Sequence, residues 1–262
     1  MNSTRRALVG AALLGSAGVA LASGKRTKVA EEPLMRLPTP QGSIPIAFVL
    51  DQGATVIDFA GPWEAFQDVG AANSDLPGFT LYTVSSSNTD EVQTTGYMLA
   101  NCDGSHNMQA CMRGIRVRPD YAFTNAPPPK IVVIGAQANG GAPEKLEWIR
   151  QVASHADVVM TVCTGAFILA RTGLLDGMSA TTHHNYYNQF ASAFPRIQLV
   201  RNRRFVDNGK LITAGGLTSG VDTALHVIAR YYGADAADRT AANMEYQSDG
   251  WRTGRQMVDM RA

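Results

Sequence analysis

Short apolar runs alternate along the chain with stretches in which apolar residues recur at helical spacing. Runs that are apolar almost without interruption indicate strands buried on both faces. Such runs cover residues 44–50, 79–84, 130–136, 158–163 and 211–216. Stretches with helical periodicity cover 61–69, 142–156, 164–173, 185–194, 219–233 and 234–247. The alternation predicts an α/β fold with a doubly wound, mostly parallel sheet and helices on both faces.

Prolines and glycines mark the ends of the predicted helices. Pro62 and Pro143 stand where a first helical turn accepts proline, and Gly173 and Gly233 stand where helices stop. In an open parallel sheet the ligand crevice lies outside the carboxyl ends of the strands. We therefore expect the functional side chains at the carboxyl ends of the strands.

The N-terminus has the pattern of an export signal. Arg5 and Arg6 precede an apolar stretch over 7–22, which ends in Ala20-Leu21-Ala22, a small-x-small cleavage pattern. This stretch is shorter than the roughly 20 residues of a membrane-spanning helix. We predict a twin-arginine-type signal peptide over 1–24, bacterial export to the periplasm or beyond, and no stable membrane anchor after cleavage.

The rest of the chain is predicted to form a linker and one domain. Residues 25–42 contain prolines but no apolar period, and 43–262 is long enough for one well-buried domain. The formal net charge of +1 gives no electrostatic reason to expect nucleic-acid binding. The basic cluster over 201–205 precedes an Asn208-Gly209 turn, so we expect its arginines on the solvated edge of a hairpin.

Cys163 is the candidate nucleophile. It stands between a predicted strand and a predicted helix, followed by Thr164 and Gly165. Free N–H groups at a helix start stabilise a thiolate and a developing oxyanion, and a small residue at the +2 position permits so tight a turn. Asp58 follows the first strand and is expected just ahead of a helix, where it can hydrogen-bond the sulfur. The alternatives are a buried structural cysteine and a helix-capping aspartate.

The other two of the three cysteines lie close together, at Cys102 and Cys111. In an oxidising compartment they can pair as a disulfide, which leaves Cys163 as a free thiol. They can also bind a metal together with His106. Met108 and Met112 nearby would then favour copper(I), and the protein would be a copper-handling one. No other residues suggest a metal site or a cofactor.

Two further strand ends carry candidate groups. Gly135, Ala136 and Gln137 begin a loop that offers backbone donors, and His183 and His184 follow a short predicted strand on the crevice side. One histidine can contact the substrate or shuttle a proton, and packing or helix capping is the alternative.

Five segments, taken together and in order, resemble the ThiJ/PfpI superfamily, whose members share a class I glutamine-amidotransferase-like domain, and within it the isonitrile hydratase branch. The segments are VIDFAGPWEAF, IRVRPDYAFTNAP, TVCTGAFILARTGLLDGMSATTHH, RRFVDNGKLITAGGLTSGVDTALHVIARYYG and NMEYQ. The resemblance implies a flavodoxin-like fold, a homodimer, and a site made of Cys163, Thr164 and Asp58. The implied reaction adds water to an isonitrile carbon and gives an N-substituted formamide.

The chain also departs from the family pattern. Gly135-Ala136-Gln137 replaces paired glycines, and the segment with Cys102 and Cys111 is an insertion into the family core. Thr164 argues against the proteases and glyoxalases of the superfamily, which have a histidine there. Because the chain ends at Ala262, we expect no helix-turn-helix domain of the kind found in related regulators. The alternative to an enzyme is a non-catalytic periplasmic ligand-binding or thiol redox-sensing module.

Overall fold

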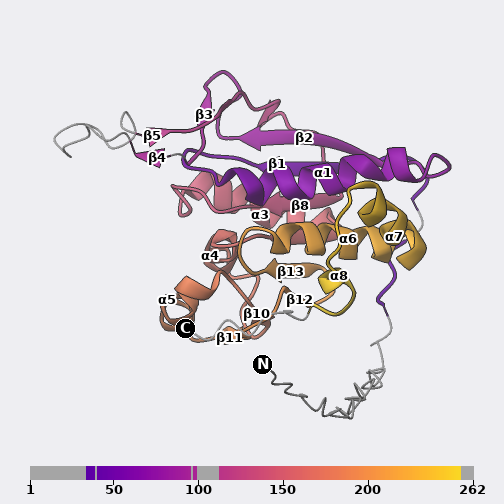
Figure 1. The fold of residues 1–262 in the computed structure, drawn as a ribbon. Coiled ribbons are helices and arrows are strands. Elements are labelled where there is room, and N and C mark those ends of the chain that lie inside the picture. The colour runs from indigo at the N-terminus through magenta and orange to yellow at the C-terminus, as the bar shows by residue number, and fades with distance from the viewer. Residues whose placement is uncertain (1–33, 39, 96, 99–111, 255–262) are drawn as a thin grey trace, which may run out of the picture. The chain divides into compact units, whose positions relative to one another are not determined.

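The computed structural model describes residues 34–38, 40–95, 97–98 and 112–254 (Figure 1). A seven-stranded sheet runs through it in the order β12-β13-β9-β8-β1-β2-β7, and every neighbouring pair is parallel except β12 with β13. The strands are β1 (Ile44–Val49), β2 (Phe79–Ser85), β7 (Tyr121–Ala122), β8 (Ile131–Ile134), β9 (Val158–Thr161), β12 (Phe205–Asp207) and β13 (Leu211–Ala214). The predicted doubly wound, mostly parallel α/β fold is therefore confirmed.

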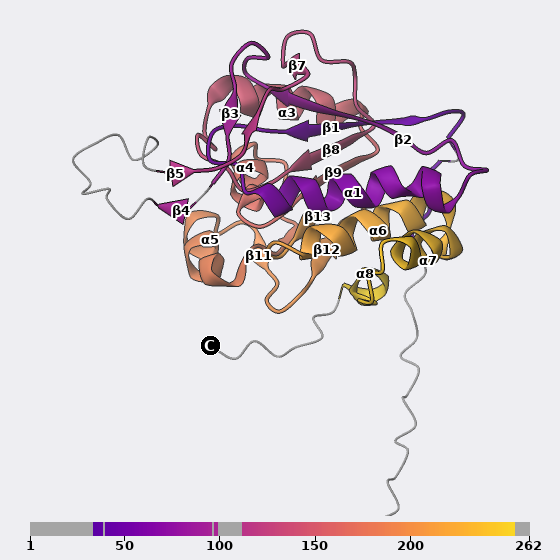
Figure 2. The ribbon, with the colours of Figure 1, turned by 45° about the horizontal axis from the view of Figure 1, so that its top comes forward.

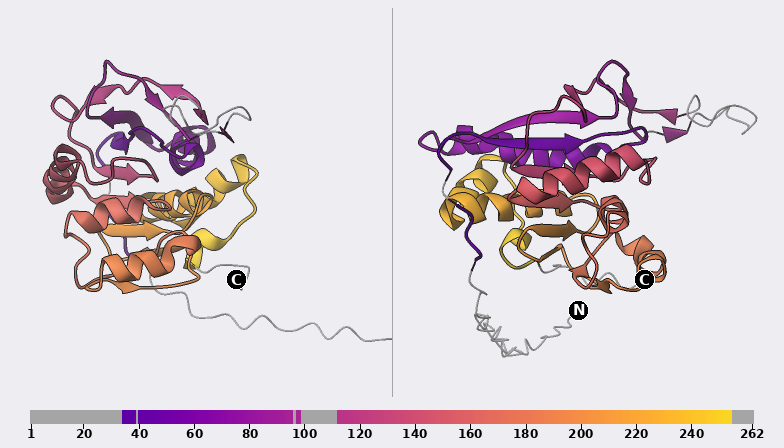
Figure 3. Two further views of the ribbon diagram at one scale, coloured as in Figure 1. Left: turned by 90° about the vertical axis from the view of Figure 1, so that its left-hand side faces the viewer. Right: turned by 180° about the vertical axis from the view of Figure 1, so that it is seen from behind.

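Helices cover both faces of this sheet. They are α1 (Val56–Ala72), α3 (Pro143–His155), α4 (Gly165–Arg171), η1 (His184–Tyr186), α5 (Tyr187–Ala193), α6 (Ser219–Tyr232), α7 (Ala234–Asn243) and α8 (Gly250–Thr253). α1 and α6 lie in front of the sheet in Figure 1, and α3 lies in front of it when the molecule is seen from behind (Figure 3). None of these helices is long and apolar enough to cross a bilayer.

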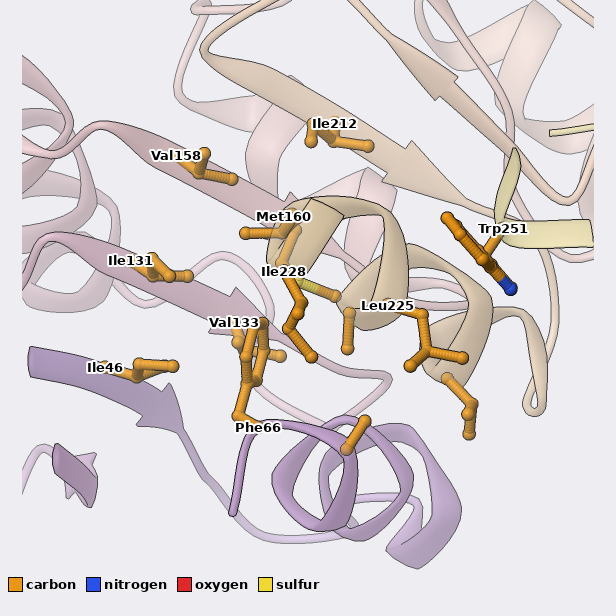
Figure 4. Close-up of a cluster of buried hydrophobic side chains, with 14 of the residues drawn as sticks. Ile46, Phe66, Ile131, Val133, Val158, Met160, Ile212, Leu225, Ile228 and Trp251 are labelled. Carbon is orange, nitrogen blue, oxygen red and sulfur yellow. The ribbon is translucent and has the colours of Figure 1, made fainter. Parts of the chain in front are cut away.

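Two apolar layers explain why the strands are apolar on both sides. Ile46 and Phe48 of β1 face the layer formed with α1, α6 and α7, whereas Ala47 and Val49 face the layer formed with α3 and α4. Figure 4 shows the first layer, where Met160 of β9 points toward Ile228 of α6. Removing both faces of the strands from water is the main force that holds this architecture together.

Short two-stranded ribbons flank the main sheet. They pair β3 (Val92–Gln93) with β6 (Arg116–Val117), β4 (Tyr97–Met98) with β5 (Met112–Arg113), and β10 (Ser179–Ala180) with β11 (Gln198–Leu199). The predicted insertion with Cys102 and Cys111 falls between β4 and β5, and β3, β4 and β5 lie at one end of the sheet in Figure 2. Cys102, His106, Met108 and Cys111 lie outside the described residues, as does the predicted signal peptide.

The first helix differs from its prediction. α1 begins at Val56, so Pro62 lies inside the helix and Asp58 lies in its first turn. The proline ring packs closely against a glycine of α6, since a Cβ on Gly220 would lie 2.9 Å from Pro62 Cγ. Gly61 of α1 approaches Val221 of α6 in the same way. The two helices therefore meet closely at their N-terminal ends, which brings Asp58 near the loop before α6.

The arginine cluster is partly buried. β12 and β13 form the predicted hairpin, but Arg204 does not lie on a solvated edge. Its Nε donates to Oδ2 of the fully buried Asp222 in α6 at 2.5 Å, and its Nη2 donates to Thr218 Oγ1 at 3.2 Å. Ser248 Oγ donates to the other carboxylate oxygen at 3.1 Å. These partners compensate the buried carboxylate of Asp222 and fix Arg204 against α6.

We predict that Arg204→Met lowers the free energy of unfolding by about 3 kcal/mol or more, because it leaves the Asp222 carboxylate buried without its cation. Arg203→Met in the same cluster should change it by less than about 0.5 kcal/mol. Urea unfolding of both variants at pH 7 measures the difference. Equal losses in the two variants would show that the buried ion pair is not what anchors the hairpin.

Candidate active site

Cys163 lies on a tight turn between β9 and α4. Its φ of +58° is unusual for a residue with a side chain, and such strain persists only where the surroundings hold it. The Cys163 N–H donates to Gly215 O at 2.7 Å, and the Val162 N–H donates to Ile134 O at 2.9 Å. A Cβ on Gly165 would lie 2.1 Å from Ile134 O, so the +2 position admits only glycine.

Asp58 is fully buried beside this turn. Its Oδ2 accepts a hydrogen bond of 2.9 Å from the Ala136 N–H, and the Cys163 thiol is a further partner of the carboxylate. Oδ1 has no hydrogen-bond partner of regular geometry among the described residues. Gly135 makes room for the aspartate, because a Cβ there would lie 2.8 Å from Asp58 Cβ.

The loop after β8 therefore holds the aspartate. The Ala136 N–H, which the sequence offered as a donor to the substrate, is already bonded to Asp58. The Gln137 amide donates to Val49 O and Gly135 O at 3.3 and 3.4 Å. A buried ion pair of 2.7 Å between Lys145 Nζ and Asp51 Oδ2 lies at the end of the same loop.

Asp58 and Cys163, the two titratable groups of the site, shift each other's pKa. Burial raises the pKa of Asp58 from 3.8 to about 6, against the opposing effects of the Ala136 N–H and the Cys163 thiol. Burial, with the Asp58 charge next in importance, raises the pKa of Cys163 to about 12, although the N–H groups of Thr164 and Leu217 act in the opposite direction. At neutral pH the pair is therefore a carboxylate beside a thiol. The N–H groups at the helix start favour the thiolate as expected, but burial of Cys163 and the facing Asp58 carboxylate outweigh them.

The loop after β13 completes the surroundings of the thiol and was missed from the sequence. Gly215 accepts the Cys163 N–H, and Leu217, with φ +48°, directs its own N–H to the sulfur. Gly216 is required by close packing, since a Cβ there would lie 2.3 Å from His183 Cδ2. The glycine pair at the end of the predicted strand 211–216 was the available signal, because it marks another strand end at the crevice.

The two predicted histidines lie on the other side of this loop. Their rings stack with centroids 4.4 Å apart. Burial and the neighbouring His184 lower the pKa of His183, whose Nδ1 accepts from the Asn185 N–H at 3.2 Å, so His183 is neutral with its proton on Nε2. Thr182, before them, donates from Oγ1 to Cys163 O at 2.8 Å.

A cleft of about 530 Å³ opens at these residues. Neither Cys163 nor Asp58 lines it directly, and the loop of Gly135 to Gln137 does not either. The thiol lies behind the lining and borders the cleft through Thr182 and the loop 215–217. The lining consists of Thr182, His183, His184, Tyr187, Arg203, Arg204, Gly215, Gly216, Leu217, Thr218, Ser219, Tyr246 and Ser248.

The described residues contain no group of three or more His, Cys, Asp or Glu side chains placed to hold a metal ion. The possible site or disulfide at Cys102, His106 and Cys111 lies outside them, so it stays a prediction. Thr164 is the N-cap of α4. Its backbone N–H donates to the Cys163 sulfur, and its side chain makes no cap hydrogen bond among the described residues.

The raised pKa of Asp58 predicts a pH-dependent stability change. The fold binds this proton more tightly than the unfolded chain does, so the stabilisation is complete below pH 3.8 and is lost as the pH rises through about 6. Asp58→Asn should therefore raise the free energy of unfolding at pH 8 by on the order of 2 kcal/mol, with the gain vanishing toward pH 4. Urea unfolding at both pH values measures it. Asp235→Asn, at an exposed first-turn position of α7, serves as control. A loss of stability at pH 8, or an equal gain at both pH values, would contradict this electrostatic account.

Comparisons with known proteins identify the family of the chain. The model of the DJ-1/PfpI family matches residues 45–230. Isonitrile hydratase of Pseudomonas putida is 32% identical over 138 residues, which cover 51% of this chain and 59% of that protein. The HTH-type transcriptional regulator CdhR of Pseudomonas aeruginosa is 26% identical over 191 residues, 72% of this chain and 51% of the regulator. The matched region thus spans little more than half the length of these relatives.

Solved structures show the same fold. A ThiJ/PfpI family protein from Pseudomonas syringae superposes with a TM-score of 0.64 at 23% identity, covering 86% of this chain and 84% of that one. The family match extends over most of the chain, from β1 to α6. The family resemblance drawn from the sequence motifs is confirmed: the chain belongs to the DJ-1/PfpI family.

Proposed function

We propose that the protein is an enzyme with a cysteine nucleophile that adds water to an isonitrile, or to a similarly small electrophilic carbon, and releases an N-substituted formamide. The observation that carries the proposal is the pairing of Asp58 with Cys163. A buried carboxylate with a pKa near 6 is ionised at neutral pH, so it can act as a general base that accepts the thiol proton as the sulfur bonds to the substrate. A purely structural cysteine would have no need of this partner.

The first step forms a covalent intermediate. The Cys163 sulfur bonds to the terminal carbon of R–N≡C while its proton passes to Asp58 and then to that same carbon. The product is a thioimidate, R–N=CH–S–Cys163. The N–H groups of Thr164 and Leu217 stabilise the negative charge that develops on the sulfur.

The second step adds water and frees the enzyme. The Asp58 carboxylate accepts a proton from water as the oxygen bonds to the thioimidate carbon, and the nitrogen is protonated, giving R–NH–CH(OH)–S–Cys163. The carbon–sulfur bond then breaks and the hydroxyl proton returns to the sulfur. The sum is one isonitrile and one water converted to one formamide, with the thiol and carboxylate restored.

The substrate class rests on similarity to the Pseudomonas putida isonitrile hydratase, combined with Thr164 after the nucleophile. Export through the signal at 1–24 and assembly as a homodimer are further parts of the proposal. The two chemical steps above need neither export nor dimer formation.

A non-catalytic ligand-binding module is the second candidate. Transcriptional regulators are among the relatives, and the cleft is lined by residues other than Cys163, so a ligand can occupy it without touching the thiol. A redox sensor is less favoured, because a thiol with a raised pKa is mostly protonated and oxidises slowly.

We predict that the protein converts a small alkyl isonitrile such as tert-butyl isocyanide to its formamide, which proton NMR detects. The value of kcat/KM should rise with pH through a midpoint near 6, where Asp58 ionises, and then level off. Cys163→Ser and Asp58→Asn should each reduce it by about a thousandfold.

Asp235→Asn is the matched control, since it makes the same change in the first turn of another helix, at an exposed position. It should leave kcat/KM unchanged. Full turnover by Asp58→Asn would exclude the aspartate as the proton-transfer group. Ligand binding in the cleft without turnover of any isonitrile would favour the binding module.

A further inference from the structure

The cleft has an uneven charge distribution. Its polar side chains are hydroxyls, imidazoles and guanidiniums, and none of the described residues that line it is an aspartate or a glutamate. The N-terminal end of α6 also opens into it, at Thr218 and Ser219, where the helix dipole is positive. Such a lining favours an anionic group on a ligand.

Arg203 supplies the uncompensated charge. The guanidinium of Arg204 is already neutralised by Asp222, and His183 is neutral at ordinary pH. Arg203 is only partly buried, lines the cleft, and has no carboxylate within 4 Å among the described residues. A single unpaired guanidinium matches a singly charged anion better than a phosphate dianion, and its planar fork matches the two oxygens of a carboxylate.

The rest of the lining is suited to an organic ligand. Leu217 is 42% exposed, and Tyr187 and Tyr246 provide apolar ring surface. The backbone N–H of Leu217 points to Cys163. Leu217 therefore borders both the thiol, through its backbone, and the cleft that Arg203 also lines.

We propose that the cleft binds small organic carboxylates, with the carboxylate on Arg203 and the reacting carbon toward Cys163. This inference rests on the proposed function for the identity of the reacting group and extends it by naming the substrate class: isonitriles that carry a carboxylate, with N-formyl amino acids as products. Arg203 is then the residue that distinguishes charged from neutral substrates.

Titration calorimetry with product-like ligands tests the anion site without turnover. N-formylglycine should bind the full-length protein at least about tenfold more tightly than its uncharged amide, N-formylglycinamide. Arg203→Gln should abolish this preference. Arg118→Gln, which removes the same charge from an exposed position outside the cleft, should preserve it. Equal affinities for the two ligands, no binding of N-formylglycine, or a preference that survives Arg203→Gln would overturn the proposal.

A kinetic comparison separates this inference from the proposed reaction. Isocyanoacetate should have a kcat/KM at least about tenfold above that of its methyl ester, and Arg203→Gln should bring the two values together. If calorimetry shows the carboxylate preference but neither isonitrile is hydrated, the anion site stands and the hydration reaction fails. If both are hydrated equally and N-formylglycine shows no preference, the reaction stands and the anion site fails.

Discussion

The carboxylate of Asp58, enclosed beside the thiol of Cys163, is the constraint on which the rest of the site depends. An ionised carboxylate in the protein interior is costly unless hydrogen bonds compensate it. Here the Ala136 N–H compensates one oxygen, while the other has no regular partner among the described residues. The remaining cost raises the pKa of Asp58, while burial of the thiol and the charge of Asp58 keep the proton on the sulfur. Stability is thus reduced at neutral pH at the place where a base is needed, a combination typical of functional sites.

Close backbone approach makes this arrangement possible. Gly135 packs against Asp58, Gly216 against His183 and Gly220 against Pro62. Gly165 packs against the backbone of Ile134 in the turn that carries Cys163. At each position a Cβ would lie within 3 Å of a neighbouring atom. The site is therefore assembled from five chain segments, which approach one another closely because these four residues lack side chains. The arginine cluster adds a division of roles: Arg204 stabilises the fold through Asp222, whereas Arg203 remains available to a ligand.

The interior strands β13, β9, β8 and β1 were predictable because they are buried on both faces and therefore appear as apolar runs, whereas the two-residue edge strand β7 gave no such run. The position of Cys163 followed from the same pattern, since the apolar run stops there and Gly165 permits the turn. The start of α1 was not predictable, because Pro62 resembles a helix start and only the packing on Gly220 reveals otherwise. The state of the thiol was not predictable either. It depends on the burial of Cys163 and on the distance to a carboxylate more than a hundred residues earlier, which the sequence does not encode locally. The partner of Arg204 was hidden for the same reason.

The most direct test of this account is the ionisation of Cys163 itself. Thiolate absorbance at 240 nm is followed against pH for the native protein, and the same titration of Cys163→Ser is subtracted to remove the other cysteines and the tyrosines. The account predicts no thiolate step from Cys163 below about pH 9, because burial and the Asp58 carboxylate keep the sulfur protonated. A step at or below pH 7 would contradict it, since the cysteine would then be a preformed thiolate that needs no base.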